Sequence, residues 1–67
     1  MINERLDYIV KAAMKNDNVV PVELVSEMYT IHNSLFKIKE YNETCSKCRN
    51  RVFSNLKLYW LELKSNA

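Results

Sequence analysis

Apolar side chains recur at intervals of three and four residues in three segments of this chain, which is the spacing of amphipathic α-helices. In the first segment they fall on one side of a helix: Ile2, Leu6, Ile9, Val10 and Ala13. Asn3 is an N-cap candidate before it, and Lys15, Asn16, Asp17 and Asn18 form a polar end that favours a turn. We predict a first helix over about residues 3–15.

A second segment opens with Pro21, which suits the first turn of a helix because its φ is already helical. The apolar arc that follows covers roughly half of the helix circumference. It consists of Leu24, Val25, Met28, Tyr29, Ile31, His32, Leu35 and Phe36. An arc this wide is typical of a helix with neighbours on two sides, so we predict a central second helix over about residues 21–36.

The third segment follows a connection from Lys37 to Tyr41, and Asn42 is its N-cap candidate. Its inner stripe contains the two cysteines and several larger side chains: Cys45, Cys48, Val52, Phe53, Leu56, Tyr59, Trp60 and Leu63. We predict a third helix over about residues 43–64. Leu58 and Leu61 fall on its polar side, where they could mark a partner surface, although single exposed leucines are also common on monomers.

Together these segments predict an all-α fold, a small three-helix domain with a long C-terminal helix. The 67 residues are enough for one domain, 1–67, with a core so small that a staple or a partner is expected. The chain has no glycine, which disfavours tight β-hairpins and excludes the glycine-rich loops that bind nucleotide phosphates. It has no apolar run of about 18 residues and no signal-like start, so we expect an intracellular protein without membrane contact.

Cys45 and Cys48 form a Cys-x-x-Cys motif, whose side chains point to the same side of a helix. One interpretation is packing, because free cysteine is among the most often buried residues. Another is zinc, with His32 as a third ligand and the fourth supplied by a carboxylate, water or a second chain. A third is redox chemistry, which would use the low pKa of a cysteine at a helix N-terminus, although the βαβ pattern of thioredoxin-like proteins is absent.

Positive charge is concentrated in the second half of the chain. Residues 1–36 carry three basic and five acidic side chains, whereas residues 37–67 carry seven basic and three acidic ones. The polar side of the third helix therefore combines basic residues with the two leucines, and we predict that it binds a protein partner through Lys47, Arg51, Ser54, Lys57, Leu58 and Leu61.

An alternative hypothesis is that the same basic face binds the phosphates of DNA or RNA, helped by Lys37, Lys39 and Arg49. The predicted connection before the third helix is longer than the turn of a helix-turn-helix motif. We do not expect an enzyme, because the single histidine belongs to no catalytic triad or comparable set.

The stretch from Cys45 to Val52, with Leu56 and Tyr59 after it and Tyr29, His32 and Asn33 before it, resembles small proteins of tailed bacteriophages. Those of Bacteroidetes-type hosts in particular combine a Cys-x-x-Cys with basic residues and a Leu-x-x-Tyr. The resemblance implies an origin rather than an activity. Our first hypothesis is thus a phage accessory protein in the virion or the host cytoplasm, a minor component of the capsid or its connector. Its partner would be a larger protein assembly or a second copy of the chain.

Overall fold

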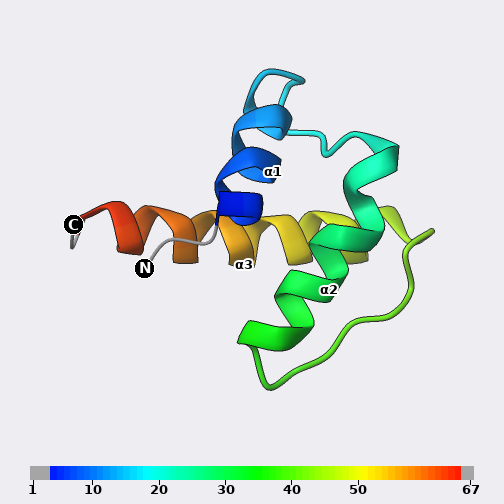
Figure 1. Ribbon diagram of the computed structural model, residues 1–67. Coiled ribbons are helices and arrows are strands. Elements are labelled where there is room, and N and C mark those ends of the chain that lie inside the picture. Colours follow the sequence, from blue (N-terminus) through cyan, green and yellow to red (C-terminus); the bar gives the residue numbers. More distant parts are fainter. Residues whose placement is uncertain (1–3, 66–67) are drawn as a thin grey trace.

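The computed structural model describes residues 4–65, and all regular structure in that range is helical. Helix α1 (Glu4–Met14) is followed by the short 3-10 helix η1 (Val22–Leu24), by α2 (Val25–Leu35) and by α3 (Ser46–Ser65). The predicted all-α domain with three helices and a long C-terminal helix is confirmed (Figure 1). The predicted cap Asn3 and the predicted core residue Ile2 lie outside the described residues.

Helix α3 forms a long base on which α1 and α2 lie (Figure 1). Its 20 residues extend about 30 Å, whereas the 11 residues of α1 and the 11 of α2 extend about 16 Å each. Both short helices pack more extensively on α3 than on each other. The prediction of a central second helix is therefore wrong, because α3 is long enough to offer one apolar stripe to both.

A single hydrophobic cluster joins the three helices. The buried stripe of α1 matches the predicted one over the described residues, with Leu6, Ile9, Val10 and Ala13. In α3 the buried residues are Val52, Phe53, Leu56 and Trp60, all of them predicted. The other predicted members of the stripe are only half-buried: Cys45, Cys48, Tyr59 and Leu63. The other buried apolar residues are Val20, Leu24, Val25, Met28, Tyr29 and Ile31.

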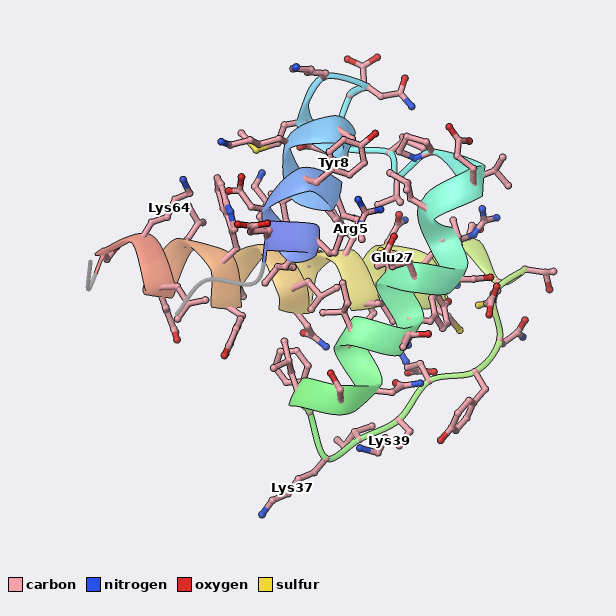
Figure 2. All side chains as sticks on the ribbon, viewed as in Figure 1. Arg5, Tyr8, Glu27, Lys37, Lys39 and Lys64 are labelled. Atoms are coloured by element: carbon pink, nitrogen blue, oxygen red, sulfur yellow. The ribbon has the colours of Figure 1, made fainter. Side chains whose placement is uncertain are left out.

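Polar and charged contacts at the edge of the core fix α1 against α2 and α3. The Arg5 guanidinium donates to both carboxylate oxygens of Glu27 in α2, at 2.6 and 2.7 Å, and lies 4.9 Å from the centre of the Tyr8 ring (Figure 2). On the other side, Trp60 of α3 donates its Nε1–H to Asp7 Oδ1 at 2.8 Å. These contacts set the position of α1 above the second half of α3.

The link between α1 and η1 turns sharply without glycine. Asp17 and Asn18 have positive φ values of 54° and 62°, the left-handed region that Asp and Asn enter more readily than other non-glycine residues. The predicted turn is confirmed, with Asp17 rather than Asn16 beside Asn18 in this conformation. Pro21 comes just before η1 with an extended ψ of 142°, so it lies outside the helix instead of in its first turn.

Helix α3 begins at Ser46, and the predicted start at residue 43 is wrong. Asn42 does not cap the helix, because its Oδ1 accepts hydrogen bonds from the N–H and hydroxyl of Thr44, at 3.2 and 2.9 Å, in a turn before the helix. The connection between α2 and α3 therefore spans residues 36–45. Within residues 4–65 no helix combines the length and the apolar character that crossing a membrane requires.

Candidate binding face and dithiol of the third helix

One side of α3 faces solvent along its length. Residues spaced three or four apart share that side, and we call the set of Lys47, Arg51, Ser54, Leu58 and Leu61 the outer face; all five are exposed. Leu58 is 62% exposed and Leu61 44% exposed, so neither contributes fully to the core. The structure brings together all the predicted partner-binding residues except Lys57, which is half-buried at the edge, where its Nζ lies 3.5 Å from Asn18 Oδ1.

A hollow of about 320 Å³ opens beside the outer face, between α3 and the connection. Its lining combines aromatic, aliphatic and polar side chains: His32, Phe36, Lys37, Ile38, Glu40, Arg51 and Asn55. Arg51 belongs to both the hollow and the outer face. Ile38 is 79% exposed, so the connection presents an apolar side chain at this hollow.

Several of the basic side chains are already engaged within the domain. Arg51 Nη1 lies 2.7 Å from the Glu40 carboxylate, whose side chain is only 17% exposed. Lys39 donates to the backbone oxygens of Asn33 and Phe36 at the C-terminus of α2, a position that suits a cation. Lys37 points away from the body of the domain (Figure 2).

Arg49 lies on a different side of α3 from the outer face. It is half-buried in a second hollow of about 230 Å³ at the start of the helix. Its Nε has no hydrogen-bond partner within the described part of the chain. The basic residues of the second half are thus divided between different surfaces.

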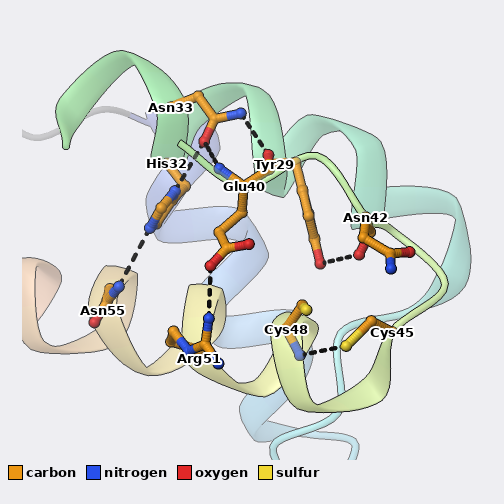
Figure 3. Close-up of polar contacts among 9 residues, drawn as sticks. All are labelled: Tyr29, His32, Asn33, Glu40, Asn42, Cys45, Cys48, Arg51 and Asn55. Carbon is orange, nitrogen blue, oxygen red and sulfur yellow. Dashed lines mark hydrogen bonds and ion pairs between the residues drawn. The ribbon is translucent and has the colours of Figure 1, made fainter. Parts of the chain in front are cut away.

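His32 is a fully hydrogen-bonded core residue. Its side chain is buried, its Nδ1 lies 3.0 Å from Asn33 Oδ1 and its Nε2 lies 3.2 Å from Asn55 Nδ2 (Figure 3). Because an amide nitrogen donates and an amide oxygen accepts, Asn55 Nδ2 donates to Nε2 and Nδ1–H donates to Asn33 Oδ1.

The predicted zinc ligands are not assembled by the structure. Both ring nitrogens of His32 are occupied by Asn33 and Asn55. Among residues 4–65, no three His, Cys, Asp or Glu side chains are placed so that they could hold one metal ion. Cys45 and Cys48 therefore stand as a pair without His32.

Cys45 is the residue that caps α3. Its carbonyl oxygen accepts the N–H of Arg49 at 2.9 Å, and its Sγ accepts the N–H of Cys48 at 3.2 Å. This is the geometry of an N-cap, in which a side chain satisfies a free N–H of the first turn. Both cysteines are half-buried at the margin of the stripe, so the prediction that they belong to the buried core is only partly right.

The two thiols differ in acidity. The Cys48 side chain and the N–H groups of Cys48 and Lys47 stabilise a thiolate on Cys45 and lower its pKa, and the positive charge of Arg51 acts in the same direction. The pKa of Cys48 is raised by the neighbouring Cys45 sulfur, by burial and by the Glu40 carboxylate. Negative charge is therefore favoured on the Cys45 sulfur over the Cys48 sulfur.

The contacts that position the connection were not evident in the sequence. Tyr29 donates its hydroxyl to the Asn42 carbonyl oxygen at 2.8 Å, and Asn33 binds the backbone of Glu40 (Figure 3). These partners are separated by 13 and 7 residues, and one of each pair lies in irregular structure. Helical periodicity carries no signal for such contacts.

Comparison of the chain with protein-family models, with curated proteins and with solved structures found no match in any of the three. Function has to be inferred from the residues of the domain. They offer an exposed face with two leucines and a dithiol at the start of the same helix.

Proposed function

We propose that this domain is a small accessory protein that acts by binding a larger protein assembly through the outer face of α3. The observation that carries the proposal is the exposure of Leu58 and Leu61, 62% and 44%, on a helix whose opposite side fills the core. Complete burial of a leucine side chain is worth about 1.5–3 kcal/mol. Two leucines one turn apart therefore supply a useful apolar centre for a contact.

The surroundings of these leucines fit a protein partner with acidic surface. Lys47 lies on the outer face toward the start of α3, where it would steer and orient such a partner, and Arg51, although paired with Glu40, keeps 60% of its side chain exposed beside it. The hollow beside Arg51 could accept an apolar side chain of the partner against Ile38 and Phe36. An apolar centre with a charged rim is the usual composition of a protein interface.

For the assembly itself we propose a phage virion, with the domain as a minor component of the capsid or its connector. This part rests on the resemblance of the Cys45–Val52 stretch to proteins of tailed bacteriophages. A second copy of the chain is the other occupant that the outer face could bind. The proposal includes no catalytic step.

Nucleic-acid binding is the less favoured alternative. Arg51 is paired with Glu40, Lys39 with backbone oxygens of α2, and Lys57 lies near Asn18. Few basic side chains thus remain to follow a phosphate backbone. Phosphate-dominated binding with about 6–10 contacts weakens by roughly 10³–10⁵ between about 50 and 200 mM salt, whereas a leucine-centred contact should persist.

The test compares two variants of the outer face with a matched control. Leu58→Asp and Leu61→Asp place charge at the centre of the proposed contact. The control Val22→Asp places the same charge outside the outer face, at a 79% exposed site in η1. The tagged full chain is recovered from the cells that make it, and its assemblies are sized by sedimentation at low and high salt. We expect each leucine variant to lower the assembled fraction by about tenfold or more, and Val22→Asp to leave it unchanged.

The circular dichroism melting curve of each variant serves as the fold control. The proposal fails if Leu58→Asp and Leu61→Asp assemble like the unmodified chain. It also fails if the retained material is nucleic acid that is lost at high salt and in the Lys47→Ala, Arg51→Ala double variant.

A further inference from the structure

We propose that Cys45 and Cys48 form a reactive dithiol that closes reversibly to an intramolecular disulfide when it meets a disulfide oxidant. Cys45 is the attacking thiol and Cys48 the resolving one. This chemistry is independent of the outer face, since neither sulfur belongs to the residues proposed to bind the partner.

The first argument is the position of Cys45. It is the N-cap of a 20-residue helix, whose aligned peptide dipoles place partial positive charge at that end. The first turn of α3 contains no acidic residue that would offset this charge. A thiolate on Cys45 is thus stabilised where cysteine reactivity is typically highest.

The second argument is the position of Cys48. The sulfur of Cys45 lies 3.2 Å from the backbone nitrogen of Cys48, so the Cys45 side chain already folds back over the first turn. Figure 3 shows both cysteine side chains on the same side of that turn. Cysteines three apart on a helix have their Cβ atoms about 5–6 Å apart, so a shift of about 1–2 Å in the first turn brings them to the roughly 3.5–4.5 Å that a disulfide requires.

The third argument is the contrast in environment. The Glu40 carboxylate of the connection opposes negative charge on Cys48, while Arg51 of α3 favours negative charge on both cysteines. Tyr29 of α2 is buried beside both, and burial, together with the two neighbouring cysteines, raises the pKa of its hydroxyl. Both cysteines are half-buried rather than enclosed, so a small disulfide can reach Cys45.

The reaction balances as two thiol–disulfide exchanges. The Cys45 thiolate attacks one sulfur of a small-molecule disulfide such as oxidised glutathione, forming a mixed disulfide and releasing one thiolate. Cys48 then loses its proton to solvent and attacks Cys45 Sγ, which forms the Cys45–Cys48 bond and releases the second thiolate. The dithiol is oxidised by two electrons and the small disulfide is reduced to two thiols.

The experiment uses the full chain, reduced, freed of reductant and kept in chelator, then mixed with oxidised glutathione near neutral pH. Samples are quenched in acid and weighed by mass spectrometry under denaturing conditions. We expect a monomer lighter by two hydrogen atoms. Cys48→Ser should stop at one glutathione per chain on Cys45. Cys45→Ser, whose hydroxyl can still cap α3, should react at least about tenfold more slowly than Cys48→Ser.

Two results would overturn the proposal. One is equal reaction rates in Cys45→Ser and Cys48→Ser, which would make the two thiols equivalent. The other is a wild-type product that remains a mixed disulfide or forms only cross-linked dimers. Assembly through the outer face is measured separately with Leu58→Asp, so failure here leaves the proposed function unaffected.

Discussion

The side chain of Asn33 binds both backbone groups of Glu40. Asn33 Nδ2–H donates to the Glu40 carbonyl oxygen at 2.7 Å, and the Glu40 N–H donates to Asn33 Oδ1 at 2.9 Å. The pair attaches the irregular connection to α2 and directs the Glu40 carboxylate toward Arg51. A segment without helix or strand is thereby held against the outer face.

Replacement of Asn33 should release this segment. Asn33→Ala removes both hydrogen bonds to Glu40 and also the contact of Asn33 Oδ1 with His32 Nδ1, and we expect a loss of about 1–3 kcal/mol in the free energy of unfolding, measured by denaturant titration. In Asn33→Asp the acceptor for the Glu40 N–H remains, so hydrogen exchange at that amide should stay slow. Unchanged exchange at Glu40 in Asn33→Ala would show that the contact does not hold the connection.

His32 should stabilise the domain because the buried imidazole is the hydrogen-bond partner of the Asn33 and Asn55 side chains. His32→Leu leaves the Asn55 amide without its partner in a half-buried position, and we expect a loss of about 2–4 kcal/mol. Thr30→Ala, at an exposed position of the same helix, is the control and should change stability by less than about 0.5 kcal/mol.

The coupling between His32 and Asn55 can be measured in a double-mutant cycle. If the hydrogen bond is the reason for the loss, the variant with both His32→Leu and Asn55→Leu should lose less than the sum of the single changes. Additive losses would instead assign the effect to packing of the imidazole ring against Phe36, whose ring centre lies 4.8 Å away.

The ionised carboxylate of Asp7 should stabilise the domain, and this stabilisation should be lost in acid. The hydrogen bond from Trp60 and then that from Lys11 hold the pKa of its carboxyl below the ordinary value of 3.8. A lowered folded-state pKa gives a stabilisation that is present above the unfolded-state value and lost as pH falls through the folded one. The free energy of unfolding should therefore decline below about pH 4, and less steeply in Asp7→Asn.

The cause of the Asp7 shift can be separated from that of Glu27, whose pKa is lowered by Arg5. In Trp60→Phe the Asp7 pKa, followed by NMR titration, should rise, while in Glu27→Gln it should stay low. An Asp7 pKa that does not respond to Trp60→Phe would mean that the 2.8 Å hydrogen bond is not its main cause.

The turn at Asp17 gives a test of backbone conformation. With φ at 54°, an alanine would occupy the left-handed region at a cost of about 1–2 kcal/mol. Asp17→Ala should thus lower the thermal midpoint, and Asp17→Gly should lower it less, because glycine has no Cβ and enters this region readily. Equal midpoints for the two variants would contradict the assigned turn.

Much of the fold could be predicted from periodicity alone. Leu6, Ile9, Val10 and Ala13 recur with the period of a helix that buries one face, and no competing pattern disturbs them. The exposed position of Leu58 and Leu61 follows from the same reasoning applied to α3. The predicted stripe of α3 is too wide, because it counts Cys45, Cys48, Tyr59 and Leu63 as buried, whereas all four are half-buried.

The start of α3 and the dithiol geometry depend on contacts between distant residues. Asn42 is a good N-cap by residue type, but its side chain binds Thr44 and its carbonyl oxygen accepts from Tyr29, so the helix begins three residues later. His32 likewise has a partner, Asn55, that is 23 residues away. Sequence spacing does not encode which polar side chains meet after folding.

The measurement that tests the central claim most directly is site-specific photo-crosslinking in the cells that make the protein. A photoreactive amino acid replaces Leu58 in one variant and Val22 in another; Val22 is also exposed but lies on η1. We predict a cross-linked protein product of defined mass from position 58, retained at high salt, and none from position 22. Cross-linking from position 22 with none from 58, or products made of nucleic acid, would contradict binding through the outer face of α3.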